Sequence, residues 1–337
     1  MNPFSYIRVR DLAQAIQEAA IGGARFIAGG TNLLDLMKEN VEQPGRLIDI
    51  NGLPLSHIEE TADGGLRIGA LVRNAALAAD PRVRARYPLL SSALLAGASP
   101  QLRNMATTGG NLMQRTRCYY FYDVATPCNK RQPGSGCGAI GGVTRIHAIL
   151  GTSDQCIATH PSDMCVAMAA LGARVNVVGP DGPRSMAFTD FHRLPGETPH
   201  LDHNLAPHEL ITSVELPRDG FPQHYSYLKI RDRLAYAFAL VSVAAALQID
   251  GGRIAAARIA LGGVAHKPWR NPDAEQSLTG MQANPENFAD FARDLLSEAK
   301  GRGDNDFKIT LAQRAIARAL AQAAAGTPQS QVDKQIV

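Results

Sequence analysis

The sequence predicts an α/β protein built from more than one domain. Apolar runs of strand length alternate with amphipathic runs of helix length over residues 1–217. The chain has 337 residues, which is more than one ordinary hydrophobic core accommodates, so we expect two or three domains. The proline-rich segment 217–222 precedes a second series of strands and helices, which is typical of a domain boundary.

The first part of the chain alternates between the two kinds of element. Asp11 can cap a helix whose apolar face contains Leu12 and Ile16, and a glycine turn separates the next strand from the next helix. After the later strands comes a polar loop at 192–208. We predict strands at 4–7, 24–28, 47–50, 66–70, 173–178 and 210–216, and helices at 11–20, 33–38, 88–98 and 162–171.

The second part begins with strands and ends with helices. The run from Ala237 to Ile249 is uniformly apolar, which indicates a buried strand. We expect further strands at 225–230 and 254–263, helices at 287–298 and 310–324, and a disordered tail from Gly326.

Composition excludes several classes of function. The 34 Lys and Arg residues nearly balance the 31 Asp and Glu residues, and aromatic residues make up 6%, so no nucleic-acid partner is expected. The N-terminus lacks a signal peptide, and no apolar run approaches the ~18–20 residues of a membrane span. We therefore expect a soluble chain without an export signal of its own.

Two glycine turns of similar composition have the character of anion-binding loops. They are Gly29-Gly30-Thr31-Asn32-Leu33 and Gly109-Gly110-Asn111-Leu112, each leading into an apolar helical start. Exposed backbone N–H groups at such turns can bind a diphosphate. Neither turn has the G-x-G-x-x-G pattern, which disfavours a nicotinamide cofactor. A tight structural connection remains the alternative for each turn.

All five cysteines of the chain lie between residues 107 and 165. No C-x2-C pair is present, which counts against a ribbon-type zinc site, and wide spacings through Pro- and Gly-containing loops suit a [4Fe–4S] cluster better. Zinc and unligated thiols remain alternatives. Cys165 lies in an apolar helical run and is expected to be a buried hydrophobe. His147 and His160 could ligate a metal, although hydrogen-bonded histidines are commoner. The candidate ligands are Cys118, Cys128, Cys137 and Cys156.

Four sequence blocks resemble the FAD-binding medium subunits of molybdenum hydroxylases. The blocks are FIAGGTNLLDLM (26–37), LRNMATTGGNL (102–112), THPSDM (159–164) and ALGGVAHKPWR (260–270). In ordinary members the GGN turn runs almost directly into the Ser-Asp segment. Here about forty residues with four cysteines intervene, as in the subset of these subunits that holds a [4Fe–4S] cluster. The nearest resemblance is to the FAD subunits of bacterial periplasmic aldehyde oxidoreductases.

The resemblance implies a fold, two cofactors and partners. It implies a two-subdomain FAD-binding fold of the vanillyl-alcohol-oxidase type with a smaller C-terminal α+β domain. It also implies electron transfer from a small [2Fe–2S] subunit and a large molybdenum-cofactor subunit through FAD to an external acceptor. Asp163 would lie near the ribityl chain and Lys229 beside the flavin, while Asp123 lies among insertion aromatics that could shield the cluster or pack near the flavin. The implied cofactor-binding residues are Arg25, Phe26, Ile27, Ala28, Gly29, Gly30, Thr31, Asn32, Leu33, Thr107, Gly109, Gly110, Asn111, Asp123, Asp163 and Lys229.

These expectations divide the chain and leave two rival functions. We expect FAD-binding subdomains at 1–60 and 61–217, a cysteine-bearing insertion at about 115–157, a C-terminal domain at 223–325 and a tail at 326–337. The resemblance favours the periplasm, reached by export with a signal-bearing partner, although the cytoplasm is an alternative. The rival functions are a zinc-stapled nucleotide-binding module and a self-contained FAD oxidoreductase.

Overall fold

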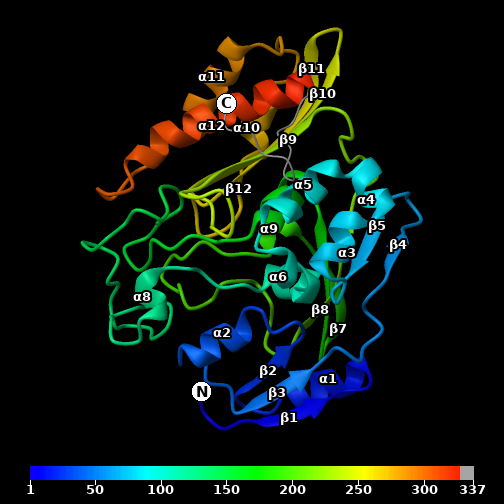
Figure 1. The fold of residues 1–337 in the computed structure, drawn as a ribbon, viewed down its shortest axis with the longest axis vertical. Helices are drawn as coiled ribbons and strands as arrows, with labels where there is room; N and C mark the ends of the chain where they lie inside the picture. Colours follow the sequence, from blue (N-terminus) through cyan, green and yellow to red (C-terminus); the bar gives the residue numbers. More distant parts are fainter. Residues whose placement is uncertain (327–337) are drawn as a thin grey trace.

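The computed structural model describes residues 1–326 and contains three β-sheets with helices packed around them. The expected tail from 327 onward lies outside the described residues. Figure 1 shows the first sheet and the C-terminal sheet at opposite ends of the molecule, with the second sheet between them. Within residues 1–326, no helix combines the length and apolar character needed to cross a membrane.

The first sheet is small and parallel, with strand order β1-β3-β2. Asp11 caps the first helix as predicted, since its side chain accepts a hydrogen bond from the Gln14 N–H at 2.8 Å. The second helix begins directly after the first glycine turn. The elements are β1 (Ser5–Arg8), α1 (Leu12–Ala19), β2 (Ala24–Ile27), α2 (Leu33–Lys38) and β3 (Arg46–Asp49).

The second sheet is antiparallel, with strand order β4-β5-β8-β6-β7, and several short helices connect its strands. Helices α5 and α9 pack against each other, and their core includes residues of β5, β6 and β8. The strands are β4 (Ile58–Glu60), β5 (Leu66–Gly69), β6 (Arg174–Gly179), β7 (Gly182–Ala187) and β8 (Leu210–Leu216). The helices are α3 (Asn74–Ala79), α4 (Pro81–Arg86), α5 (Pro88–Ala96), α6 (Pro100–Met105), α7 (Thr108–Leu112), α8 (Tyr119–Tyr122) and α9 (Asp163–Ala170).

The C-terminal sheet is antiparallel, with order β12-β11-β10-β9, and both of its faces are covered. Along β10, Val243 and Ala245 belong to the core with α11 and α12, while Ala244 and Ala246 belong to the core with α5 and α9. Burial on both faces explains the continuous apolar run. The elements are β9 (Tyr225–Ile230), β10 (Val241–Asp250), β11 (Arg253–Gly262), β12 (Trp269–Arg270), α10 (Pro272–Gln276), α11 (Pro285–Leu295) and α12 (Phe307–Ala325).

The long strands and helices lie within a few residues of their predicted positions, and segment 217–222 lies between β8 and β9. No sequence pattern predicted the short elements α3, α4, α6, α7, α8, α10, β4, β7 and β12. None of these is longer than six residues. They are too short for a periodic pattern to identify them.

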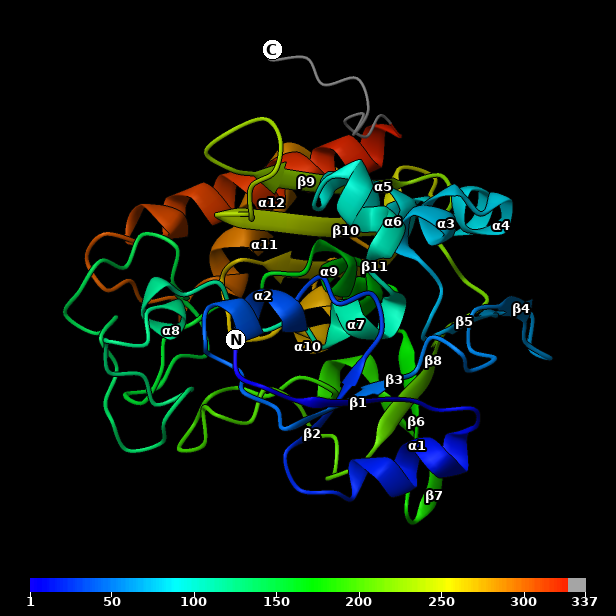
Figure 2. The same ribbon diagram turned by 60° about the horizontal axis from the view of Figure 1, so that its bottom comes forward.

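The cysteine-bearing insertion forms a lobe of irregular chain in which α8 is the one named helix. Figure 2 shows the same lobe at one side of the molecule, beneath α12. Charged side chains that are buried or partly buried connect this lobe to the rest of the protein. Lys130 donates to the Pro199 carbonyl oxygen at 2.7 Å and pairs with Asp202, while Arg115 donates to Asp202 at 2.8 Å and also pairs with Glu42. Asp202 thus joins the insertion to loop 192–208.

We predict that Asp202→Asn destabilises the protein by about 3 kcal/mol, since the buried Lys130 and the partly buried Arg115 would lose this carboxylate. Burial alone would raise the pKa of Asp202, but these two cations outweigh it and hold the pKa below its usual range. A lowered folded-state pKa stabilises the fold above the unfolded value of ~3.9 and loses that effect as the pH falls further. Thermal unfolding followed by circular dichroism from pH 3 to 7 measures both effects.

The matched control for this experiment is Asp181→Asn, because Asp181 is exposed in the turn between β6 and β7. This variant should unfold like the wild type at every pH. Equal losses in the two variants would show that the Asp202 network does not carry the stability.

Candidate functional site

The first glycine turn, residues 29–32, connects β2 to α2 and has unused backbone donors. A Cβ at Gly29 would lie 1.9 Å from the Met105 carbonyl oxygen, and Gly30 has φ +72°, so both positions require glycine. Within residues 1–326, no group of the protein accepts a hydrogen bond from the N–H of Gly29, Gly30, Thr31 or Asn32. This turn therefore offers successive N–H groups to an anion.

The second glycine turn has the same composition but a different role. It forms the start of α7, where Thr107 caps the helix by accepting from the Gly110 N–H at 3.2 Å. The Thr108 and Gly109 N–H groups donate to carbonyl oxygens of Val72 and Ala70 beside the second sheet. Its donors are therefore largely occupied, and a Cβ at Gly109 would lie 3.1 Å from the Ala70 Cβ. The turn is fixed against the sheet, with Gly110 exposed.

The two glycine turns lie next to each other. Gly29 packs on the carbonyl oxygen of Met105, which lies two residues before Thr107. Arg73 donates to this same carbonyl oxygen and to the Asn51 Oδ1 at 3.2 Å. The guanidinium group of Arg73 thereby links the end of the first sheet to the segment before the second turn.

Asp163 and Lys229 form a buried ion pair next to the second turn. The Lys229 Nζ donates to the Asp163 Oδ2 at 2.8 Å, and the Tyr227 hydroxyl donates to Oδ1 at 2.6 Å. Ser162, the N-cap of α9, donates from its hydroxyl to the Asn111 Oδ1 at 2.6 Å. The structure thus brings together Asn111, Asp163 and Lys229, three predicted site residues that are distant in sequence.

The remaining predicted residues lie at the edge of this group or apart from it. Phe26 and Ile27 belong to β2, and Ala28 follows them. Leu33 begins α2. Arg25 is exposed, and its Nε lies 3.8 Å from the Glu42 Oε2. Asp123 is exposed in the insertion, and its carboxylate accepts from the Ala125 N–H at 3.0 Å. The structure places Asp123 at the surface of the insertion, where it begins a turn closed by the Thr126 N–H on its carbonyl oxygen.

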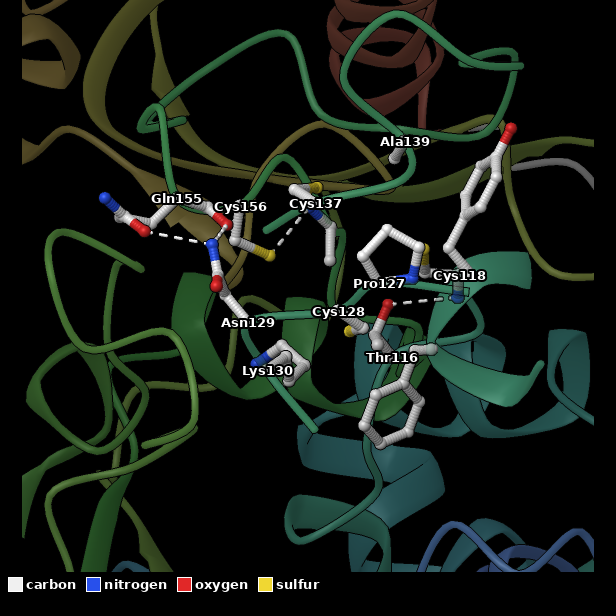
Figure 3. Close-up of a pocket in the computed structure, with 13 residues that line it drawn as sticks. Thr116, Cys118, Pro127, Cys128, Asn129, Lys130, Cys137, Ala139, Gln155 and Cys156 are labelled. Atoms are coloured by element: carbon white, nitrogen blue, oxygen red, sulfur yellow. Dashed lines mark hydrogen bonds between the residues drawn. The ribbon is translucent and has the colours of Figure 1, made fainter. Parts of the chain in front are cut away.

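The four cysteines selected from the sequence line one pocket, which we call the cysteine pocket (Figure 3). Three of them are buried, Cys137 is partly exposed, and none of the described cysteines forms a disulfide. Cys128 and Cys137 face each other in an isolated antiparallel bridge. Leu36 of α2 packs in the same apolar cluster, so the pocket adjoins the helix that follows the first glycine turn.

The protein itself provides little to stabilise thiolates in this pocket. Burial raises the pKa of Cys118 to about 12 and that of Cys156 to about 11, although Lys130 partly opposes the second shift. The His147 Nε2 lies 3.1 Å from the Cys118 Sγ, and the Ala158 N–H donates to the Cys156 Sγ at 3.4 Å. Burial also lowers the pKa of His147 to about 4, so the imidazole is neutral. A bound metal would supply the missing positive charge.

Cys165 lies apart from this pocket, inside α9. It is fully buried, and burial raises its pKa to about 12. Its sulfur and one ring nitrogen each of His160 and His192 lie within 4.8 Å of one another. His192 supports the second glycine turn by hydrogen bonding from Nε2 to the Leu112 carbonyl oxygen at 2.9 Å.

The donor sets fit the two implied cofactors. Unused N–H groups beside two obligatory glycines fit the diphosphate of FAD. Four thiols around one pocket fit a four-coordinate metal centre, either an iron–sulfur cluster or zinc.

Sequence reasoning missed several residues that support these sites. Tyr227 contacts the predicted residue Asp163, Arg73 binds the Met105 carbonyl oxygen on which Gly29 packs, and Lys130 and Arg115 hold the insertion. No local pattern marks any of them. Lys130 adjoins a cysteine segment, but its partner Asp202 is 72 residues away.

Known proteins match nearly the whole chain. The family described as the FAD binding domain in molybdopterin dehydrogenase matches residues 2–219, and the CO dehydrogenase flavoprotein C-terminal domain matches residues 225–323. The chain is 55% identical to the aldehyde oxidoreductase FAD-binding subunit PaoB of Escherichia coli (strain K12), over 96% of this chain and 99% of that protein. It is 26% identical to the carbon monoxide dehydrogenase medium chain of Afipia carboxidovorans, over 95% and 98% of the two chains.

A solved structure shows the same fold. Carbon monoxide dehydrogenase from Hydrogenophaga pseudoflava aligns with a TM-score of 0.76 and 26% identity, over 97% of this chain and 99% of that chain. Together with the family matches, this confirms the predicted class, an FAD-binding α/β fold followed by a smaller C-terminal domain.

We predict that Gly29→Ala weakens FAD binding roughly tenfold to a hundredfold, because about 1–3 kcal/mol of overpacking would displace the first turn from Met105. Flavin absorbance per chain after desalting measures the effect. Gly22→Ala is the matched control, since nothing lies within 4 Å of a Cβ at Gly22. Wild-type flavin content in both variants would argue against the first turn as the diphosphate site.

Proposed function

Because this chain belongs to the family of FAD-binding subunits of the molybdenum hydroxylases, we propose that it is the flavin subunit of an aldehyde oxidoreductase complex. The observation that carries the proposal is the 55% identity to an aldehyde oxidoreductase FAD-binding subunit. The unused backbone donors at Gly29–Asn32 support it, because they are free to bind the cofactor. Its partners are a small [2Fe–2S] subunit and a large molybdenum-cofactor subunit. An external acceptor receives the electrons.

The residues of this chain bind and orient the cofactor, and they form and break no covalent bonds themselves. The N–H groups of the first turn hold the diphosphate, and the second turn forms a fixed wall beside it. The ion pair of Asp163 with Lys229 keeps a carboxylate and an ammonium group at a defined place near the flavin. FAD, when bound, supplies the ability to accept and release electrons.

The proposal includes a [4Fe–4S] cluster held by Cys118, Cys128, Cys137 and Cys156. The support is chemical: the four thiols line one pocket and form no disulfide, and burial raises the pKa of Cys118 and of Cys156, which disfavours their ionisation unless a cation is bound. The pocket is also near the flavin loop. Arg117, next to Cys118, donates to the Asn32 Oδ1 at 3.2 Å and pairs with Asp35 of α2.

The proposal extends to a periplasmic location, reached by export together with a signal-bearing partner. This part draws on the family resemblance.

Serine substitution tests the cluster. We predict that serine at position 118, 128, 137 or 156 lowers iron and acid-labile sulfide per chain severalfold, because each change removes a thiolate ligand. Cys165→Ser is the matched control and should keep the full iron content, because Cys165 lies in α9. Metal analysis and visible absorption provide the readout. A colourless chain that carries zinc would contradict the cluster.

Purification tests the role as a subunit. We expect the chain to co-purify with two partners and to lack aldehyde oxidation by itself, because residues 2–219 match an FAD-binding domain and residues 225–323 a flavoprotein domain of multi-subunit dehydrogenases. An affinity-tagged copy expressed with its neighbouring genes allows both measurements. Full aldehyde oxidation by the isolated flavin-loaded chain would favour a self-contained oxidoreductase.

A further inference from the structure

His147 faces the sulfur of one proposed cluster ligand inside the protein. Its Nε2 lies 3.1 Å from the Cys118 Sγ, and the two residues are 1% and 7% exposed. Within residues 1–326, His147 is the one side chain that hydrogen bonds to a sulfur of the cysteine pocket. The Cys156 Sγ, by comparison, accepts from a backbone N–H.

The chemistry of the pair fixes the direction of this hydrogen bond. A metal-bound thiolate has no proton and can act as an acceptor only. The ring nitrogen that faces it must therefore carry the hydrogen. A neutral imidazole has one N–H, and the His147 Nδ1 is buried without a partner among the described residues, which is consistent with the proton lying on Nε2.

The C-terminal domain holds this imidazole in place. The His147 carbonyl oxygen accepts from the Lys308 Nζ at 2.7 Å and from the Asn305 Nδ2 at 3.2 Å. Both donors are fully buried, and Lys308 belongs to α12. The His147 N–H donates to the Thr144 carbonyl oxygen at 2.8 Å. The backbone of His147 is thus fixed on both sides.

We propose that His147 is a positioning residue that sets the reduction potential of the cluster, by donating its Nε2–H to the Cys118 thiolate. The inference rests on the proposed cluster. A reduced cluster carries one more negative charge than the oxidised form, so a donor at a ligand sulfur stabilises the reduced form more. His147 therefore makes the cluster easier to reduce, and Lys308 of α12 fixes the backbone that carries its imidazole.

The test is a redox titration of the purified complex, followed by electron paramagnetic resonance of the reduced cluster. His147→Phe keeps an aromatic ring but removes the donor, and His147→Gln restores an N–H donor. We expect His147→Phe to lower the ratio of reduced to oxidised cluster about tenfold at a fixed potential, which is ~59 mV for one electron. His147→Gln should return the potential toward the wild-type value. If His147→Phe does not accumulate, His147→Asn, whose side chain is too short to reach the sulfur, takes its place.

Tyr120→Phe is the matched control, because it keeps the ring that lines the cysteine pocket and removes only a hydroxyl that accepts from the Val143 N–H. It should leave the potential unchanged, and an equal shift there would overturn the inference. An unchanged potential in iron-loaded His147→Phe would also overturn it. Iron loss in His147→Phe as complete as in Cys118→Ser would make His147 a ligand instead. A wild-type complex whose chain holds no [4Fe–4S] signal would overturn the proposed cluster itself, which is a separate outcome.

Discussion

The partly buried carboxylate of Asp202 makes the interaction on which the arrangement of the two proposed cofactor sites depends. It accepts from Lys130 and Arg115, and Arg115 continues to Glu42 beyond α2. Three segments therefore meet at one point: the unit with the first glycine turn, the start of the insertion, and loop 192–208. The cysteine-bearing insertion has little regular secondary structure, so few hydrogen bonds of helices or sheets hold it in place. Paired charges inside the protein give it a defined position instead.

The two glycine turns have different roles in binding a dinucleotide. They are almost identical in composition, but the N–H groups of Gly29–Asn32 have no partners within residues 1–326, whereas those of the second turn are largely used to bind the second sheet. The N–H groups of the first turn can thus bind a ligand, whereas those of the second turn are used to hold the protein together. A fixed second turn beside an open first turn gives a preorganised site, because little ordering remains to be done when a ligand binds.

Much of this arrangement could be predicted from the sequence, and the rest depends on contacts that no local pattern records. The apolar run around Cys165 separated that cysteine from the other four, and the structure places it in a helix core. Long strands such as β10 could be read from their composition. The contact of His147 with Cys118 spans 29 residues of irregular chain, and Gly29 meets Met105 across 76 residues. The sequence marks Gly29 as special, but the reason lies in a carbonyl oxygen that only the fold brings near.

The hydrogen bond between Asn111 and Ser162 has a consequence for the origin of the insertion. The chain leaves the second turn after Asn111 and returns at Ser162, and these two side chains are 2.6 Å apart. A segment whose ends touch can be added or removed without changing the register of the surrounding strands. The insertion therefore leaves and re-enters the fold at neighbouring points. Removing the sulfur-rich lobe would leave both glycine turns in place, but it would also take Lys130 and Arg115 away from Asp202, so the carboxylate would have to change with the lobe.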